Sequence, residues 1–503
     1  MNRNKKIAKN TLFLYIRMFL VMGISLYTSR IVLEALGIVD FGIYNIVGST
    51  VLLFSFLSTS LTIAVQRYLA YVLGNGDLNR FGLLFSQAFW TYLILSLFIL
   101  IIAETVGLAI LYNYIDIPDG RFSAAFWVYQ YSIFTFIISI IRLPYNAAIL
   151  ACEKMSFFAY ISIVEVFLKL LVTYLLVILS FDKLISYSVL LLAVSVVISV
   201  WYHCYCLKKL DGCKLKFSID KSIIHELVKF SGWSMLSSAS LTLTNQGVNI
   251  LLNNFFGVLI NAANGISVQI MNALSQFLGN FQMAFNPQII KSYANGDYRY
   301  LRSLIFRTSL ISFYLMALIA IPLMTKMDYV LSLWLKTVPE YACEFSICII
   351  ISFLIESYAG PLWMTVQAVG EIKRYQIIIS SLYLLNILGS FVFLYAGYPP
   401  LSVFVVRIIV TILVLSARVF LLNFLLEFSI RDYFLRVILR SYMLFLVLFF
   451  ISYYIGLHLH GFGGLILFII ISVSISSTLI FCCGFEKSDR NTLIRILLKR
   501  VRK

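Results

Sequence analysis

Eight ionisable side chains interrupt stretches of this sequence that are otherwise apolar, and their types limit the chemistry that those stretches can support. They are Arg17, Arg30, Glu104, Glu165, Lys169, Glu356, Arg407 and Arg418. A charge at the centre of a membrane helix costs about 2.5–3.5 kcal/mol on insertion scales, so such residues usually face protein or a hydrated cavity. Five of the eight are cations, which favours an anionic ligand over a cationic one.

Two of the cations have a spacing that suits a phosphate group. Arg407 and Arg418 are eleven residues apart, so on a helix they lie within about 20° of one face and roughly 16 Å apart along the axis. Arginine presents a planar fork to phosphate, and this stripe could pass an anionic head group from one guanidinium to the next. Alternatively, both side chains snorkel to opposite interfaces. Arg30 and Glu104, near outer helix ends, could also reach lipid headgroups. The cations that we predict to bind substrate are Arg17, Arg30, Lys169, Arg407 and Arg418.

The acids are candidates for ion coupling. Glu165 and Lys169 stand at positions i and i+4 with the acid first, the favourable order for a helix pair. The pair either neutralises a buried face or responds to a proton or ion. Glu356 has no partner three or four residues away, and a lone carboxylate near mid-membrane could carry a coupling proton. We therefore predict Glu165 and Glu356 as ion-coupling residues.

Amide side chains form a second polar feature. Asn245, Asn249 and Asn253 repeat every four residues and make one stripe, and the next apolar segment adds amides on a similar spacing, at Asn264, Asn272, Gln276 and Asn280. Amides of this kind either hydrogen-bond between helices or line a hydrated cavity that receives sugar hydroxyls. We include Asn245, Asn249 and Asn253 among the predicted substrate-binding residues.

Other kinds of chemistry have no motif in this sequence. There is no nucleophile elbow, nucleotide-binding loop or metal-ligand cluster, and the eight cysteines have no metal-ligand spacing. We therefore expect no enzyme activity, no cofactor and no metal. Pro144 and Pro361, which occupy matching places, are expected to mark helix breaks.

The elements that must position these side chains are transmembrane helices. The chain is 61% hydrophobic and 12% charged, and a spanning helix needs about 20 apolar residues. Connections are short, which leaves no room for a soluble domain. The composition predicts an all-α polytopic membrane protein of about fourteen spans, at residues 11–33, 43–65, 82–103, 123–143, 157–180, 184–206, 230–254, 260–285, 303–323, 341–364, 376–397, 400–425, 438–457 and 461–484.

The basic residues predict the orientation of these spans. When the chain is threaded alternately through them, 30 of the 39 Lys and Arg residues fall on the face that holds both termini. The opposite loops hold only Arg121, Lys183, Lys326 and Lys336. Because short cytoplasmic loops are rich in Lys and Arg, both termini are expected in the cytoplasm. The net charge of +17 is spread from loop to loop, which indicates membrane lipid rather than nucleic acid as a partner.

An internal repeat divides the predicted helices into two sets. At an offset of 220, Gly37-Ile38 matches Gly257-Val258, and Gly-Asn-Gly-Asp77 matches Ala-Asn-Gly-Asp297. Six spans per copy give both copies the same orientation, the parallel-repeat arrangement of one transporter class. The repeat predicts an N-terminal six-helix lobe at 1–220, a C-terminal six-helix lobe at 221–430, and two additional helices with a basic cytoplasmic tail at 431–503.

Four motifs in the first lobe resemble a known family. They are Asn10-Thr-Leu-Phe-Leu-Tyr-Ile-Arg17, Ser29-Arg30-Ile-Val-Leu-Glu-Ala-Leu-Gly37, Asp40-Phe-Gly-Ile-Tyr-Asn45, and Gln66-Arg67-Tyr-Leu followed by Gly-Asn-Gly-Asp77. Together they are similar to the polysaccharide transporters of the multidrug/oligosaccharidyl-lipid/polysaccharide exporter (MOP) superfamily, and most of all to the O-antigen or capsule repeat-unit flippases. The motifs are specific for the family and say nothing of the sugar carried.

The resemblance implies a flippase of the bacterial cytoplasmic (inner) membrane. Its substrate would be an undecaprenyl-diphosphate-linked oligosaccharide of the O-antigen (lipopolysaccharide) or capsule type, moved by alternating access, with other polysaccharide assembly proteins as candidate partners. One alternative is a multidrug or cation efflux antiporter of the same superfamily, which would need a net acidic cavity. Another is a membrane-embedded polysaccharide polymerase, which would need a large external loop and no two-lobe repeat.

Overall fold

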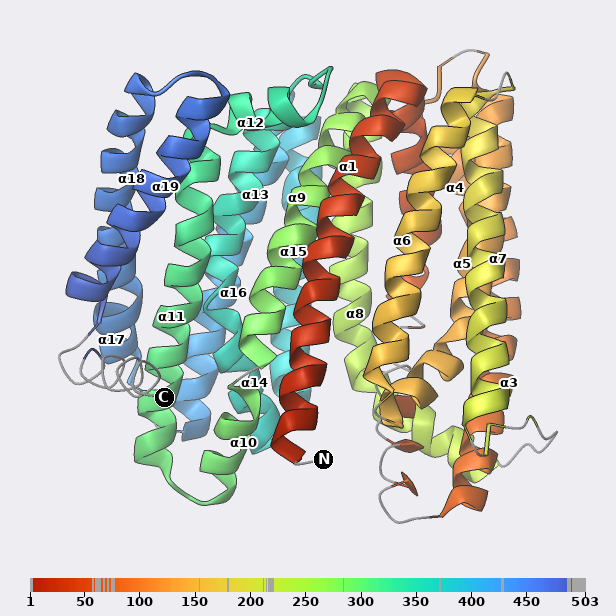
Figure 1. Cartoon of the computed structure of the whole chain (residues 1–503), viewed down its shortest axis with the longest axis horizontal. Coiled ribbons are helices and arrows are strands. Elements are labelled where there is room, and N and C mark those ends of the chain that lie inside the picture. Colours follow the sequence, from red (N-terminus) through yellow and green to blue (C-terminus); the bar gives the residue numbers. More distant parts are fainter. Residues whose placement is uncertain are drawn as a thin grey trace. The chain divides into compact units, whose positions relative to one another are not determined.

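The chain folds into long helices that run side by side (Figure 1). The computed structural model describes residues 3–490, except 57, 59–64, 67, 70–71, 74–76, 119, 153, 179–180, 211, 214, 216–220, 284, 371, 427–428 and 486–489. It also leaves out the side chains of residues 3–18, 155, 221–237, 280, 283, 287, 291, 294 and 372. Helices are the only regular structure of the described part, which contains no strand.

Contacts within the chain define two compact units. Unit 1 contains residues 1–266, 334–342 and 383–403, and unit 2 contains 267–333, 343–382 and 404–503. The helices up to residue 283 are α1 (Arg3–Leu52), α3 (Leu78–Ile102), the π-helical turn η1 (Ala103–Gly107), α4 (Leu108–Asn113), α5 (Phe122–Ala151), α6 (Met155–Ile178), α7 (Lys183–Lys209), α8 (Lys221–Phe256) and α9 (Val258–Met283). Those that follow are α10 (Asn286–Ala294), α11 (Tyr298–Thr325), α12 (Met327–Trp334), α13 (Ala342–Glu356), α14 (Ala359–Val369), α15 (Ile372–Tyr395), α16 (Leu401–Leu426), α17 (Ile430–Tyr433), η2 (Phe434–Leu439), α18 (Arg440–His458), α19 (Gly461–Leu479) and η3 (Ile480–Gly484).

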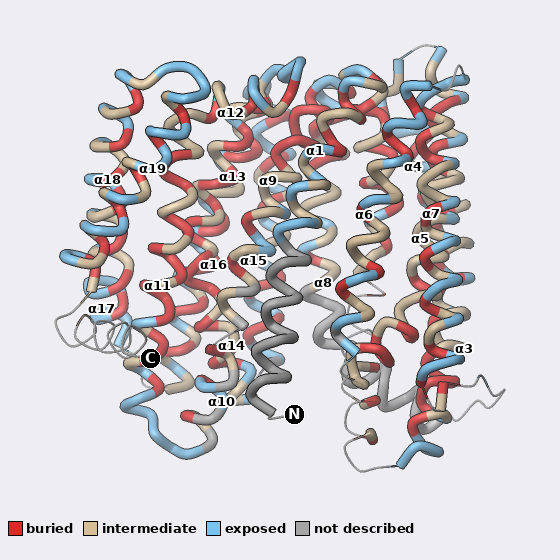
Figure 2. Tube along the Cα trace, in the orientation of Figure 1, coloured by how far each residue is buried: buried red, intermediate tan, exposed pale blue. Residues whose placement is uncertain are grey.

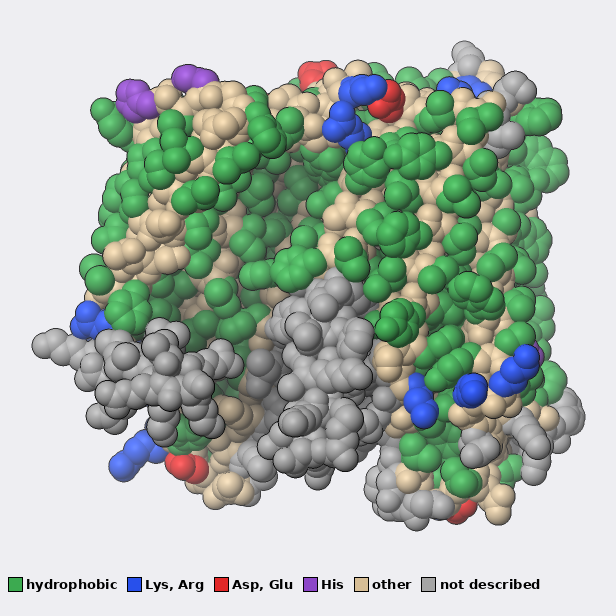
Figure 3. Space-filling model, viewed as in Figure 1, with side chains coloured by type: hydrophobic (Ala, Val, Ile, Leu, Met, Phe, Trp, Pro, Cys, Tyr) green, Lys and Arg blue, Asp and Glu red, His purple; other side chains and the backbone are tan. Residues whose placement is uncertain are grey.

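This is an all-α polytopic membrane protein. Among the described residues, ten helices are long and apolar enough to span a membrane, or eleven if the bent pair α13 and α14 is one span. Hydrophobic side chains cover the middle of the face drawn in Figure 3, and Lys and Arg lie toward the ends of the helices. The all-α membrane class is thus confirmed, whereas the count of fourteen spans is not.

The predicted repeat has matching local structure in its two copies. Gly37 lies at φ 77° inside α1 and Gly257 at φ 76° between α8 and α9, a left-handed conformation that favours glycine. Asp77 and Asp297 cap the helices that follow them, each accepting a hydrogen bond from the backbone N–H three residues later, at 2.9 and 3.1 Å. The division into lobes at residues 220 and 430 stays a prediction.

In unit 1 the second half of α1 crosses α9 at very close range. A Cβ added to Gly42 would lie 2.1 Å from the carbonyl oxygen of Val258, and one added to Gly265 would lie 2.7 Å from the Asn45 side chain. Positions 45 and 265 differ by 220, the offset of the predicted repeat, so a duplication with this offset would have its local two-fold axis at this crossing.

In unit 2 the two trailing helices pack around α11. Two-thirds of its spanning window is buried, and Figure 2 shows this as a run of buried residues along the helix. Phe313 of α11 stacks on Tyr358, whose hydroxyl is hydrogen-bonded to Ser441 of α18. Lys326 donates to the Leu459 carbonyl at 3.1 Å, in the turn between α18 and α19. Residues 440–484 are therefore an integral part of unit 2.

The two prolines behave differently. Pro361 is the third residue of α14, just after a 41° bend from α13, where its missing N–H would have no intrahelical partner in any case. Pro144, in contrast, lies within α5, which continues to Ala151. The predicted break at Pro144 is wrong, because a membrane helix tolerates the loss of one hydrogen bond when its surroundings compensate.

Candidate functional site

Three charged residues within the predicted spans of unit 1 form a triad across two helices. Glu165 of α6 lies 2.9 Å from the Lys169 ammonium and 3.3 Å from Nη1 of Arg142 on α5. Arg142 also lies over the ring of Tyr202 on α7, at 5.4 Å from its centroid. The predicted pair of Glu165 and Lys169 is thus confirmed, but it is one half of a group with net charge +1.

Arg142 was missed by the sequence reasoning because Pro144 was expected to end its helix. It stands at the edge of the predicted span 123–143 and was not counted among the intramembrane charges, whereas nine residues of helix follow it before α5 ends at Ala151. The overlooked sequence signal is the apolar run at 147–151, which continues the helix beyond the proline.

The triad lies at mid-depth and is partly exposed. Glu165 is ten residues from the start of α6, about 15 Å along the axis, and thirteen from its end. The side chains of the triad are between 21% and 44% exposed. Ionised groups at this depth are too costly to present to hydrocarbon, so we expect the exposed edge of the triad to face a hydrated cavity.

The charged pair of unit 2 lies beside a break in a helix. Glu356 is the last residue of α13, and its Oε1 lies 2.9 Å from Nη1 of Arg418 on α16. The Arg418 side chain is only 8% exposed. At the break itself, Gln282 donates to the Ser357 carbonyl at 3.3 Å. Interpreting Glu356 as a lone carboxylate was wrong, because its partner comes from another helix.

The remaining predicted cations are separate from these groups. Arg407 is half-buried, and its Nη2 lies 3.1 Å from the sulfur of Met271. It shares α16 with Arg418 but has different contacts. Arg30 is half-buried on α1, and the side chain of Arg17 lies outside the described residues.

Two of the predicted amides belong to a buried hydrogen-bonded cluster in unit 1. Oδ1 of Asn249 accepts from Asn261 at 2.6 Å and from Asn264 at 2.8 Å, and its Nδ2 donates to Ser49 of α1. Asn253 donates to Asn261 at 2.9 Å. These four asparagines are at most 5% exposed, so the cluster joins α1, α8 and α9.

The amide cluster also anchors a loop. Oδ1 of Asn253 accepts from the Asp116 N–H at 2.8 Å, and its Nδ2 donates to the Asp116 carbonyl at 3.2 Å. Of the two roles considered for the amides, these contacts supply hydrogen bonding between elements. Asn245 is half-buried, and its role in substrate binding stays a prediction.

An ion cluster closes the end of unit 1 that carries Gly37 and Gly257, which we call the distal end. Arg121 pairs with both carboxylate oxygens of Asp40 and lies 2.6 Å from Oδ2 of Asp182. Burial raises the pKa of Asp182, but its hydrogen bonds from Arg121 and from the Ile185 N–H outweigh that effect and lower it overall.

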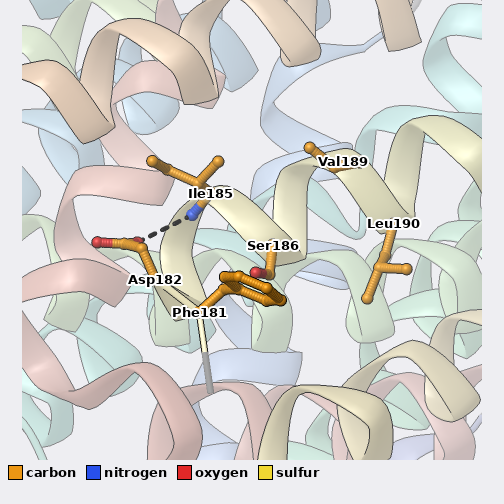
Figure 4. A pocket seen from close by; sticks show the side chains of 6 residues that line it. All are labelled: Phe181, Asp182, Ile185, Ser186, Val189 and Leu190. Carbon is orange, nitrogen blue, oxygen red and sulfur yellow. Dashed lines mark hydrogen bonds between the residues drawn. The ribbon is translucent and has the colours of Figure 1, made fainter. Parts of the chain in front are cut away.

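A pocket of about 430 Å³ adjoins this cluster (Figure 4). It is lined by Phe181, Asp182, Ile185, Ser186, Val189 and Leu190. Its one charged group, Asp182, is held at the start of α7 by the hydrogen bond from Ile185. Because the wall is apolar and the single charge is negative, the pocket does not fit an anion.

Together these features define a polytopic helical bundle that carries charged groups within its membrane helices. Solved structures with the same fold include a transporter of the MOP superfamily. A multidrug resistance MATE family transporter in its inward-facing conformation matches with TM-score 0.64 and 14% identity over 82% of this chain and 96% of that chain. The MATE multidrug transporter DinF-BH matches with TM-score 0.65 and 17% identity over 85% and 97%.

The lipid II flippase MurJ, in an inward closed conformation, matches with TM-score 0.67 and 12% identity over 94% of this chain and 99% of that chain. No family model and no curated protein matches the sequence. Identities this low establish the fold alone, so the chain has the MOP transporter fold, and its substrate must be argued from its own residues.

Proposed function

We propose that this chain is a flippase that moves an undecaprenyl-diphosphate-linked oligosaccharide repeat unit, of the O-antigen or capsule type, across the bacterial cytoplasmic membrane. The observation that carries the proposal is the triad of Arg142, Glu165 and Lys169. Its net positive charge and exposed edge at mid-depth suit a diphosphate, because guanidinium and ammonium groups form strong charge-assisted hydrogen bonds with phosphate oxygens. Transport would proceed by alternating access, with no chemical step.

The two trailing helices support a lipid-linked substrate. The match to MurJ leaves out about 6% of this chain, roughly 30 residues, which is fewer than the 73 residues from 431 to the C-terminus. Part of the trailing segment must therefore be shared with that flippase. These helices present exposed apolar side chains such as Phe450 and Phe462, which suits contact with a prenyl chain.

Efflux of a cation is the second candidate, because two of the similar structures are multidrug transporters. Such a substrate needs an unpaired carboxylate in the cavity. Glu165 and Glu356 are both paired with cations, so neither is available to attract a cationic drug. A polymerase is disfavoured by the short connections between the helices.

The proposal is tested by deleting the gene and measuring both sides of the transport step. We expect lipid-linked repeat units to accumulate in the membrane while polymerised surface glycan is lost. Wild-type protein should restore the glycan, and Arg142→Gln or Lys169→Gln should not. Lys209→Gln, which removes an exposed cation from the end of α7, is the matched control and should restore it fully.

A different outcome of this deletion experiment would indicate another function for the chain. If deletion left the glycan and its lipid-linked precursor unchanged but sensitised the cells to cationic drugs, the efflux candidate would replace the flippase. If precursor and polymer both disappeared, the chain would act before transport.

A further inference from the structure

The segment from Trp334 to Ala342, which we call the strap, packs on α1 although the chain on either side of it belongs to unit 2. It joins α12 to α13, and its own contacts place it in unit 1. Nε1 of Trp334 donates to the Leu26 carbonyl of α1 at 2.6 Å, and Lys336 forms an ion pair with Glu34. The strap therefore attaches to α1 at two points.

These two attachment points lie on either side of Arg30. Leu26, Arg30 and Glu34 are four residues apart, and residues at that spacing lie one above the other on a single helix face. Arg30 is half-buried. The strap thus runs along the face of α1 that carries this intramembrane cation.

The strap is held by contacts that can be reversed. The side chains of Lys336 and Glu34 are 59% and 44% exposed, and exposed ion pairs contribute little to stability. Tyr341 has φ 64° and is the single non-glycine residue with positive φ in the described part of the chain. A bulky residue in the left-handed region is strained, and strain of this kind is typical of segments that change conformation.

We infer that the strap is a lid over Arg30, held closed by Trp334 and Lys336 and opened when these two contacts are released. Under the proposed function, on which the transport role of the lid rests, an open strap would expose Arg30 to the diphosphate at the distal end.

The lid is tested by the accessibility of position 30 in the purified full-length protein in nanodiscs. Arg30→Cys is labelled with a maleimide, and the rate is followed peptide by peptide by mass spectrometry so that native cysteines do not interfere. Adding Trp334→Phe and Lys336→Gln should raise the labelling rate about tenfold, the factor that corresponds to the loss of one net hydrogen bond. Cys204, exposed on α7, should be labelled at the same rate in every variant.

Two further variants move the lid in the opposite direction. A disulfide between Glu34→Cys and Lys336→Cys should close the strap and slow the labelling of position 30 until a reductant is added. Tyr341→Gly removes the backbone strain of the closed strap without removing either contact, and should slow labelling severalfold. Equal labelling rates in the crosslinked, native and double-substituted proteins would overturn the lid.

The experiment separates the lid from the proposed function, since labelling requires no substrate. If labelling responds as described while deletion of the gene leaves the glycan unchanged, the lid stands and the flippase proposal fails. If labelling does not respond while deletion blocks glycan export, the flippase proposal stands and the lid fails. If both stand, the protein with Glu34→Cys and Lys336→Cys crosslinked and with Arg30 intact should fail to support export until it is reduced.

Discussion

At Glu165 a single carboxylate serves two cations, and this asymmetry predicts unequal effects of substitution. Glu165→Gln leaves Arg142 and Lys169 facing each other without a counter-ion, whereas Arg142→Gln leaves the Glu165–Lys169 pair intact. Breaking a buried ion pair costs about 3–5 kcal/mol, and partial exposure should reduce this to about 1–2 kcal/mol for Glu165→Gln. Thermal unfolding in detergent should give a lower Tm for Glu165→Gln than for Arg142→Gln. Equal values would mean that Arg142 and Lys169 are not held by one carboxylate.

Asn249 and Asn245 offer a matched comparison on one helix. Asn249→Ala removes the side-chain acceptor of Asn261 and Asn264 and the donor to Ser49, and each hydrogen bond lost from the buried cluster costs about 0.5–1.5 kcal/mol. Asn245→Ala, one turn earlier and half-buried, should change the free energy of unfolding by less than about 0.5 kcal/mol. Denaturant unfolding of the two variants measures the difference. A loss of stability in Asn245→Ala alone would show that the cluster does not hold α8 to α9.

Sequence could predict residue pairs on one helix but not those between helices. The spacing of Glu165 and Lys169 was sufficient to predict that they form a pair, because residues four positions apart lie next to each other on a helix. The partners Arg142 and Arg418 come from other helices, and their contacts depend on helix packing, which no local pattern encodes. The four-residue spacing of Asn249 and Asn253 predicted that they share one helix face. Whether they pack between helices or bind a ligand could be decided only from their burial in the structure.

At the scale of elements, the crossing of α1 and α9 depends on the lack of a side chain at Gly42. Gly42→Ala would place a Cβ 2.1 Å from a backbone oxygen of α9, and overpacking of this kind typically costs about 1–3 kcal/mol. Gly48, in the same helix, has open space around it, so Gly48→Ala should be neutral or stabilising by up to about 1 kcal/mol through helix propensity. Thermal unfolding of the two variants provides the test. If both alanines were tolerated equally, α1 and α9 would not be in close contact at this point.

Element boundaries followed from the sequence where the backbone imposes a special conformation. The paired glycines and the paired aspartate caps were visible as repeats, and both have the same local geometry in the two copies. The end of α5 could not be predicted, because a proline at Pro144 is compatible with either a break or a continuous helix, and the surrounding packing decides between them. That one ambiguity also concealed Arg142.

On the scale of the whole molecule, the four cations expected opposite the termini are largely engaged within the protein. Arg121 is paired with two aspartates, Lys336 with Glu34, and Lys326 with a carbonyl. The positive-inside bias counts Lys and Arg in short loops and is not a rule of net charge, so these pairings leave the predicted orientation unchanged.

Reporter fusions test the predicted orientation of the chain in the membrane. Green fluorescent protein joined after residue 503 should be fluorescent, because both termini are expected in the cytoplasm. Alkaline phosphatase, which is active only after export, should be active when inserted at His460 between α18 and α19 and inactive at the C-terminus. The turn at 459–460 is a suitable site, because His460 precedes the first residue of α19 and interrupts no helix. Active phosphatase at the C-terminus would contradict the predicted orientation, because it would place the C-terminus outside the cytoplasm and the strap, with its lid over Arg30, on the cytoplasmic side.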